Sequence, residues 1–477
     1  MTAARPTPAD HASAILSAMQ GLDASAIDRT WSQPGHPVMA HADALADAAD
    51  SDDEATRASG LEALFAGLVE LLNDGFTRAG RSAYAAVFPR MVWRVASRDA
   101  ELSQALRDLG IGDEAALRSR YAAARAGASP LPGDPRRIAV LSRVTIGADI
   151  LLTSIALQRL HQRFPRAEIA LIGDAKLTGL FGGMPGVHVR PLSYPRRGPL
   201  RTRLTSWLRV LEAVEAERAD LVVGPDSRLD QLGVLPVIRE DGRYLLWENT
   251  LDAPLSLAET YDRWLARRLQ LPASPGTLPS LALDAPALAL RSRLGDALGP
   301  APIAAVKLDH GGNPAKALPR AAEVSLLREL RSRGWRILLD RGFGREELAN
   351  SDALIADLGW TPTDLDDSGS GIGRAVEAWT PASLVDAELV RFHGSIAGWA
   401  AAASLCGLAL SYDSVGHHLA AALGVPVVVA FTGFADPGFP IAWQPRGNAR
   451  IDVVAIATER KADPAEWARV CERFPRL

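Results

Sequence analysis

The chain is poor in cysteine and has no surplus of positive charge. Among its 477 residues only Cys406 and Cys471 occur. Two cysteines in apolar or terminal helical patterns argue against a disulfide framework or a cysteine-based metal site, and they favour a reducing compartment. The formal net charge of -4 excludes the general excess of Lys and Arg on which a nucleic-acid binder depends. Small or membrane-linked partners are expected instead of nucleic acid.

Long apolar runs are also lacking. No window approaches the ~20 uninterrupted apolar residues of a membrane-spanning helix, and the first residues lack the apolar core of a signal peptide. We therefore expect a cytoplasmic protein. Hydrophobic residues at 48% and charged residues at 23% are typical of globular domains. The length favours two or three domains, each with its own core.

Residues 1–128 show helical periodicity and no convincing strand. Ser51 and Glu54 have the spacing of a capping box, and the apolar residues that follow them fall on one helical face. These patterns predict an all-helical N-terminal domain. Its apolar stripe is explained either as core or as a surface for a homo-oligomer or an acceptor. Residues 126–135, rich in proline and glycine, predict a linker.

After the linker, short apolar runs alternate with helical patterns. In the first half the predicted strands are 138–141, 168–172, 187–190 and 220–224. In the second half they are 303–308, 335–340, 389–392, 408–412 and 427–431. This alternation predicts an α/β fold with two tandem Rossmann-like domains, 137–272 and 287–455, followed by a C-terminal helical segment, 456–477. Ligands of such sheets bind outside the carboxyl ends of the strands, so a cleft between the two domains is expected.

Residues 408–434 form the most informative stretch. An apolar run leads into Asp413 and Ser414, whose short oxygen-bearing side chains can cap a helix. The predicted helix covers 417–423, and Gly424 stands where a left-handed C-terminal cap would fall. Backbone amides and the dipole at the start of this helix favour a negatively charged ligand such as a diphosphate. We interpret this as the phosphate site of a donor substrate.

Five segments carry a resemblance to a known family. They are 149–157 (DILLTSIAL), 312–319 (GNPAKALP), 394–395 (GS), 413–426 (DSVGHHLAAALGVP) and 436–437 (DP). In this order and spacing they resemble glycosyltransferase family 9, the heptosyltransferase-like enzymes, whose signature reads D-[ST]-G-x-x-H-L-A-A-A-L-G-x-P. The resemblance covers roughly 137–450 and leaves the first ~130 residues unexplained.

The sequence departs from the family pattern at four places. The Gly-Asp of the family is here Gly147-Ala148-Asp149, and the glycine after [ST] is Val415, with Gly416 one place later. The proline of the family's first helix is here Ile155. Its F-G-P-T is here Phe431-Thr432-Gly433-Phe434.

The resemblance implies a GT-B fold, in which the first Rossmann-like domain binds the acceptor and the second binds a nucleotide-sugar. It implies a metal-independent, inverting glycosyltransferase without a cofactor. Such an enzyme would move a sugar, with heptose as the usual one of the family, to a glycan, lipid-linked or protein acceptor. Two alternatives stay open: a non-catalytic nucleotide-sugar-binding or scaffold protein, and a nucleotide-sugar epimerase.

Transfer with inversion needs a base for the acceptor hydroxyl and a stabiliser for the leaving diphosphate. The resemblance assigns the first role to Asp149 and the second to Lys316, although a capping aspartate and a solvated lysine would look the same. The residues implied for donor binding are Asp413, Ser414, Val415, Gly416, His418, Glu346 and Ser395. A core histidine is the alternative for His418, and a helix-dipole partner is the alternative for Glu346. His417 is treated as structural.

Arginines cluster in the predicted acceptor domain. Arg196, Arg197 and Arg201 could bind phosphates or carboxylates of an acceptor, or contact an anionic membrane surface, and a solvated helix face explains them equally well. A metal site is not predicted. Residues 364–366 imitate the D-x-D of metal-dependent glycosyltransferases, but we interpret them as part of a flexible Gly/Ser-rich linker.

Overall fold

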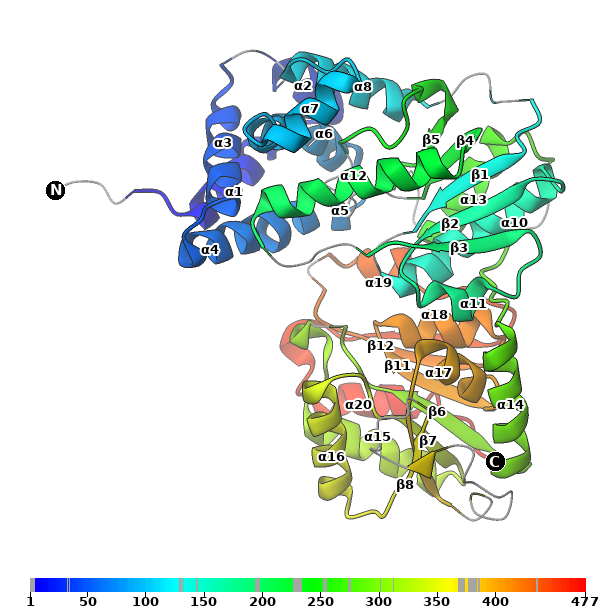
Figure 1. The fold of residues 1–477 in the computed structure, drawn as a ribbon. Helices are drawn as coiled ribbons and strands as arrows, with labels where there is room; N and C mark the ends of the chain where they lie inside the picture. The colour runs from blue at the N-terminus through cyan, green and yellow to red at the C-terminus, as the bar shows by residue number, and fades with distance from the viewer. Residues whose placement is uncertain are drawn as a thin grey trace. The chain divides into compact units, whose positions relative to one another are not determined.

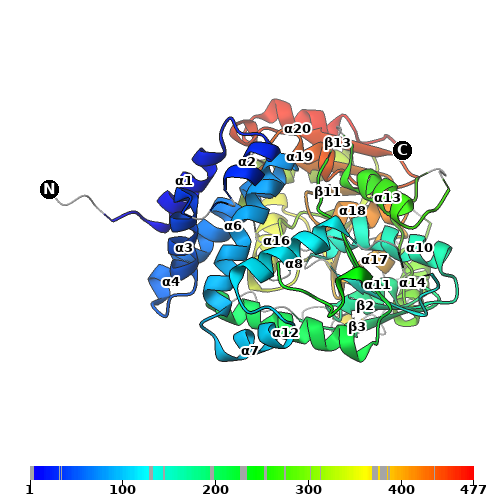
Figure 2. The same ribbon diagram turned by 90° about the horizontal axis from the view of Figure 1, so that it is seen from above.

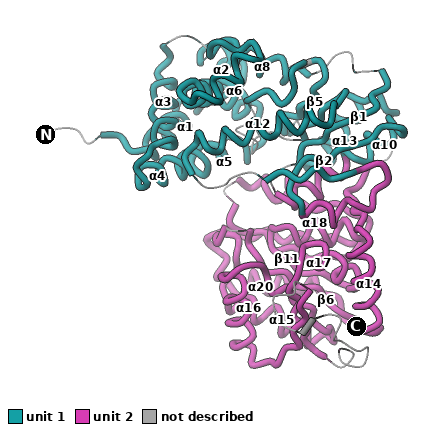
Figure 3. The backbone as a smooth tube through the Cα atoms, in the orientation of Figure 1, with its two compact units in different colours: residues 1–144, 156–175, 188–274 teal, residues 145–155, 176–187, 275–477 magenta. Residues whose placement is uncertain are grey.

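The structure is a computed structural model. It describes residues 5–477 except 32, 34, 128–130, 132, 143–144, 194–197, 226–233, 252–254, 273–275, 301, 312, 368–373, 376–383, 385–386 and 435. The chain divides into two compact units (Figure 3). The first unit comprises residues 1–144, 156–175 and 188–274, and the second comprises 145–155, 176–187 and 275–477. The proposed domain boundaries stay a prediction, and each unit is described by itself.

The first unit begins with helices. They are α1 (Pro8–Met19), α2 (Ala24–Thr30), α3 (Pro37–Ala49), α4 (Glu54–Leu64), the π-helix η1 (Phe65–Val69), α5 (Glu70–Asp74), α6 (Arg78–Ala96), α7 (Ala100–Asp108) and α8 (Glu114–Ala126). Helices α1, α3 and α4 pack side by side (Figure 2). The capping box expected at Ser51 is wrong. Asp53 is the N-cap of α4, because its carboxylate accepts a hydrogen bond from the amide of Thr56 at 2.8 Å.

A sheet of five strands completes the first unit, in the order β3-β2-β1-β4-β5. The strands are β1 (Arg137–Leu141), β2 (Glu168–Gly173), β3 (Val187–Pro191), β4 (Leu221–Gly224) and β5 (Tyr244–Leu246). The accompanying helices are α10 (Ser154–Arg163), α12 (Leu200–Ala216) and α13 (Leu257–Arg268). Helix α12 runs between the N-terminal helices and the strands (Figure 1) and contacts both α6 and β2.

One hydrophobic core joins the N-terminal helices to this sheet. Leu64 and Phe88 from the helices, Trp207 from α12 and Val222 from β4 belong to the same cluster of fully buried side chains. The regular elements described up to residue 126 are helices, as expected. A separate all-helical domain is not confirmed, because its core continues into the sheet.

The second unit is built on an eight-stranded sheet whose paired strands run parallel, in the order β13-β12-β11-β6-β7-β10-β8-β9. The strands are β6 (Ile303–Lys307), β7 (Arg336–Asp340), β8 (Thr363–Asp366), β9 (Arg374–Ala375), β10 (Leu389–His393), β11 (Leu408–Tyr412), β12 (Val427–Phe431) and β13 (Ile451–Ala455). The helices are α9 (Ile146–Ala148), the π-helix η2 (Asp149–Thr153), α11 (Leu177–Phe181), α14 (Ala285–Leu298), α15 (Arg320–Ser332), α16 (Arg345–Leu358), α17 (Ile396–Ala403), α18 (Val415–Ala422), α19 (Phe439–Ala442) and α20 (Pro464–Cys471). The mixed α/β architecture with two parallel sheets fits the GT-B type of fold. Among the helices that the structure describes, none has both the length and the hydropathy of a membrane-spanning segment.

The interpretation of residues 364–366 as a flexible linker is wrong. They belong to strand β8, which pairs with β10, and Leu365 and Asp366 are buried. The carboxylate of Asp364 accepts hydrogen bonds from the Nε and Nη2 atoms of Arg391 at 2.6 and 2.7 Å. This bidentate pair holds the Asp364 side chain against Arg391 of the neighbouring strand β10. The glycines at 369, 371 and 373 lie outside the described residues.

The strand order of the second sheet reverses next to β6. The chain passes from β6 through α15 to β7 on one side, and from β11 through α18 to β12 on the other. The carboxyl ends of β6 and β11 are therefore neighbours whose connections leave in opposite directions. In open α/β sheets, this is the point where ligands bind.

Candidate functional site

Two residues predicted from distant segments meet at this point. Lys316 ends the short 3-10 helix η5 (Pro314–Lys316) in the connection after β6, and Asp413 directly follows β11. The Nζ atom of Lys316 lies 2.6 Å from Oδ2 of Asp413, and the two side chains are 24% and 9% exposed. The ammonium group also lies 5.7 Å from the centre of the Phe439 ring. A cation is thus held at the switch point by a nearly buried carboxylate.

Helix α18 begins earlier than the sequence indicates. Its first residue is Val415 rather than His417, and of the two candidate capping residues, Asp413 and Ser414, the N-cap is Ser414. The hydroxyl of Ser414 accepts a hydrogen bond from the Gly416 amide at 3.3 Å. The Nδ1 atom of His417, which is fully buried, lies 3.2 Å from the Ser414 amide and 3.0 Å from the Tyr412 carbonyl. His417 therefore stabilises the turn that starts the helix.

Gly416 allows the start of α18 to sit directly on the sheet edge. A Cβ atom at this position would lie 2.6 Å from Oγ of Ser411 and 3.0 Å from Cδ of Lys307. Lys307 is buried below it and pairs with Asp340 and, at 3.4 Å, with Asp309. Burial alone would lower the pKa of Lys307, but the two carboxylates outweigh that effect and raise it. A second lysine thus stays charged beneath the helix start.

His418 presents an uncharged imidazole. Its side chain is 4% exposed, and its Nδ1 atom has no hydrogen-bond partner among the described residues. Burial lowers the pKa of His418 well below its usual value, and His417 and Lys316 lower it further. The ring is therefore neutral at pH 7. Thr432, after β12, likewise has a buried hydroxyl without a described partner. Thr432 is not among the donor-binding residues predicted from the sequence.

The segment that carries Asp149 contacts the start of α18. A Cβ atom on Gly147 would lie 3.2 Å from Cδ2 of His418 and 3.4 Å from Cα of Val415, so this turn packs closely on the helix. Asp149 follows in η2 and is 1% exposed. Its Oδ1 atom accepts a hydrogen bond from the hydroxyl of Thr153 at 2.7 Å. The structure brings the proposed base and the proposed phosphate site into one unit, and the role of Asp149 as base stays a prediction.

The two remaining predicted donor residues lie along the same edge. Glu346 is exposed in the first turn of α16, after β7. Ser395 is the N-cap of α17, after β10, and its hydroxyl accepts a hydrogen bond from the Gly398 amide at 2.9 Å. Both follow strands whose carboxyl ends continue the edge formed by β11 and β6. Within the described residues, no group of three or more His, Cys, Asp or Glu side chains is arranged to hold a metal ion.

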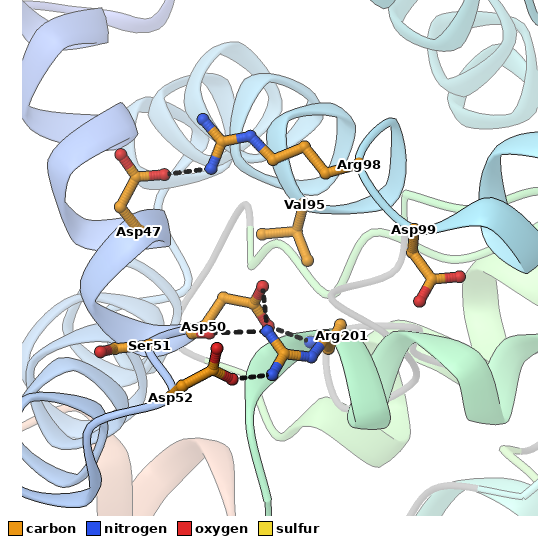
Figure 4. Close-up of a pocket in the computed structure, with 8 residues that line it drawn as sticks. All are labelled: Asp47, Asp50, Ser51, Asp52, Val95, Arg98, Asp99 and Arg201. Carbon is orange, nitrogen blue, oxygen red and sulfur yellow. Dashed lines mark hydrogen bonds and ion pairs between the residues drawn. The ribbon is translucent and has the colours of Figure 1, made fainter.

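Of the predicted acceptor residues, only Arg201 can be placed, because Arg196 and Arg197 lie outside the described residues. Arg201 starts α12 in the first unit and lines a cavity of about 450 Å³ (Figure 4). Its amide donates to Oδ1 of Asp50 at 2.7 Å, and its guanidinium pairs with Asp50 and Asp52. The cavity is lined by Asp47, Asp50, Ser51, Asp52, Val95, Arg98, Asp99 and Arg201. Two carboxylates thus neutralise Arg201, and its acceptor role stays a prediction.

Comparison with known proteins found similar solved structures but no similar sequence family. No protein-family model matches the sequence, and no curated protein matches it either. Solved structures similar to this chain include glycosyltransferases of family 9. One is the family 9 glycosyl transferase from Veillonella parvula DSM 2008, with 15% identity, a TM-score of 0.49, and coverage of 71% of this chain and 98% of that chain.

Two similar structures are heptosyltransferases. E. coli ADP-heptose lps heptosyltransferase II has 15% identity and a TM-score of 0.45, covering 71% of this chain and 99% of that one. An E. coli heptosyltransferase determined with ADP has 17% identity and a TM-score of 0.44, covering 67% and 93%.

Proposed function

We propose that the protein is a glycosyltransferase that uses a nucleotide-sugar as its donor and binds the donor diphosphate at the start of α18. One observation carries this proposal: the strand order reverses between β6 and β11, and Lys316 and the first amides of α18 lie at that reversal. Parallel α/β sheets bind anionic ligands at such points, where backbone amides and the helix dipole face the ligand.

The groups at this point suit a leaving diphosphate. Negative charge develops on the phosphate oxygens as the glycosidic bond to the donor breaks. The ammonium group of Lys316 and the amides of Val415 and Gly416 would stabilise this charge, so we propose transfer without a metal ion or cofactor. The neutral His418 could donate a hydrogen bond to a phosphate or a sugar hydroxyl. Heptose is the sugar that we propose first.

Asp149 is the base that we propose. Its carboxylate would take the proton of the acceptor hydroxyl, and the hydroxyl oxygen would then attack the anomeric carbon from the side opposite the diphosphate. This geometry inverts the anomeric configuration. The acceptor would be a glycan, a lipid-linked glycan or a protein.

Binding and transfer can be tested separately. Calorimetric titration with ADP, UDP, GDP and their sugars measures donor binding, and product analysis with a glycan acceptor measures transfer. The substitution Asp149→Asn should reduce transfer about 100- to 10,000-fold, as expected for loss of a general base, and leave ADP affinity unchanged. Asp296→Asn removes the same charge from an exposed position on α14 and should leave both unchanged.

Three results would contradict the proposal. Full transfer by the Asp149→Asn variant would reject Asp149 as the base. An epimer formed from a nucleotide-sugar without acceptor would favour an epimerase. Failure of the wild-type protein to bind any nucleotide would favour a scaffold.

A further inference from the structure

An exposed aromatic ring stands on the same sheet edge and has no role in the site described above. Phe343 follows β7, and its side chain is 64% exposed. It lies between Gly342 and Gly344, whose φ angles of 85° and 108° are accessible mainly to glycine. The backbone therefore adopts a turn with positive φ angles on both sides of Phe343, and this turn exposes a large apolar ring to solvent.

This ring is held in place before any ligand binds. The amide of Phe343 donates to Oε2 of Glu347 at 2.5 Å, and Nδ1 of His393 lies 3.0 Å from the carbonyl oxygen of Gly342. Because a carbonyl only accepts, Nδ1 of His393 carries the hydrogen and donates it. The rings of His393 and Phe343 stack with centres 5.8 Å apart and an interplanar angle of 24°. The buried His393 thus supports the exposed ring from below.

The position of the ring matches where a nucleoside would extend from the proposed diphosphate site. Strands β11, β6 and β7 are consecutive neighbours in the sheet, so the end of β7 lies roughly 10 Å from the end of β11 at the usual strand spacing. On the opposite side of the site, Gly433 packs against the backbone of Ala315 so closely that a Cβ atom would lie 2.5 Å from it. That contact leaves no room for a side chain at Gly433, so we expect the nucleoside on the β7 side.

We propose that Phe343 is the stacking surface for the base of the donor nucleotide. This inference rests on the proposed diphosphate site and names the part of the donor that lies beyond it. Aromatic rings stack on any base, and a purine offers the larger face. The Nζ atom of Lys176 lies over the Phe343 ring, 5.6 Å from its centre. Glu346, three residues further on, can accept hydrogen bonds from the ribose hydroxyls.

Calorimetry on the full chain tests the inference with two probes, ADP and inorganic pyrophosphate. The substitution Phe343→Ala should weaken ADP binding about 5- to 100-fold, the range found when an aromatic residue stacked on a base is removed. Pyrophosphate affinity should change less than about twofold, because pyrophosphate has no base to stack. Phe343→Trp should bind ADP as the wild type does. Phe343→Leu should be as weak as Phe343→Ala, since it keeps an apolar side chain without a ring.

The control is Leu288→Ala, which removes another exposed apolar side chain, on α14, and should change neither affinity. Equal ADP affinity in the wild type and Phe343→Ala would overturn the stacking role and leave the proposed function intact. Equal losses of ADP and pyrophosphate affinity in a variant with a native circular dichroism spectrum would also overturn it. A wild-type protein that binds neither probe would reject the proposed function, and this inference with it.

Discussion

Replacement of Lys316 tests the phosphate site most directly. In Lys316→Met the side chain stays long and unbranched and loses its ammonium group. The ammonium group lies 2.6 Å from the carboxylate of Asp413, so its removal has two effects. The ligand loses a cation, and Asp413 becomes an uncompensated negative charge that repels the diphosphate.

The expected loss of ADP affinity follows from the exposure of Lys316 and from its distance to Asp413. Lys316 is 24% exposed, which places it in a partly screened environment. A hydrogen bond from a charged donor contributes about 1.5–3 kcal/mol in such sites, so loss of the cation alone should weaken ADP binding about 10- to 150-fold. The uncompensated charge of Asp413 adds repulsion, and we expect a total loss of at least about 100-fold. Asp413→Asn in the same chain removes the repulsion and should recover about tenfold.

The assay is calorimetric titration of ADP into the wild type, Lys316→Met, Asp413→Asn and the double variant. These four affinities form a double-mutant cycle, which isolates the coupling between the two side chains. Circular dichroism and urea unfolding serve as controls for the fold. If Lys316→Met binds ADP within about twofold of the wild type, Lys316 does not bind the diphosphate. The repulsion assigned to Asp413 is refuted if the double variant binds more weakly than Lys316→Met.

Three further predictions concern packing and charge. Gly433→Ala should lower the free energy of unfolding more than Gly424→Ala does. Both glycines have φ near 75°, but only at Gly433 would a Cβ atom meet backbone atoms, at 2.5 Å. Urea unfolding measures the difference, and equal losses in the two variants would contradict the prediction. The depressed pKa of His418 should rise when an anion binds, so ADP binding should take up protons and strengthen as the pH falls through the range of that pKa. Calorimetry in buffers of different ionisation heat measures this uptake, which should diminish in His418→Gln. Asp262→Asn should lower the free energy of unfolding by about 3–5 kcal/mol, because the buried Arg159 loses its bidentate carboxylate partner. A loss below about 1 kcal/mol in urea unfolding would contradict this prediction.

The sequence predicted five strands of the second sheet, β6, β7, β10, β11 and β12, because each contains a short apolar run. It missed β8, β9 and β13, which complete the sheet. The run at 408–412 is fully buried as β11. The start of the next helix was harder to place. Asp413 and Ser414 are both good capping residues, and local sequence does not distinguish them. The choice depends on Lys316, which lies far away in the sequence and pairs with Asp413.

Long-range partners also explain the other errors. Asp364 precedes a Gly/Ser-rich stretch, and the sequence alone therefore suggests a flexible loop. In the structure, Arg391 on a neighbouring strand binds its carboxylate. The role proposed for Phe343 had no clear signal beyond two flanking glycines. Its support comes from His393, which belongs to another strand. Charge pairs and ring contacts across a sheet are set by tertiary structure, so a linear pattern does not reveal them.

The shared core of the first unit has a consequence for how this chain can be shortened. Backbone and side-chain bonds tie the N-terminal helices to later segments: the Leu251 amide donates to the Phe76 carbonyl at 3.1 Å, and Arg120 donates to the Ile238 carbonyl at 2.8 Å. Deleting the first 126 residues would strip one face of the sheet of its apolar cover. Such a truncated protein should aggregate rather than yield a minimal enzyme. The helices and the sheet should melt together, as a single cooperative unit.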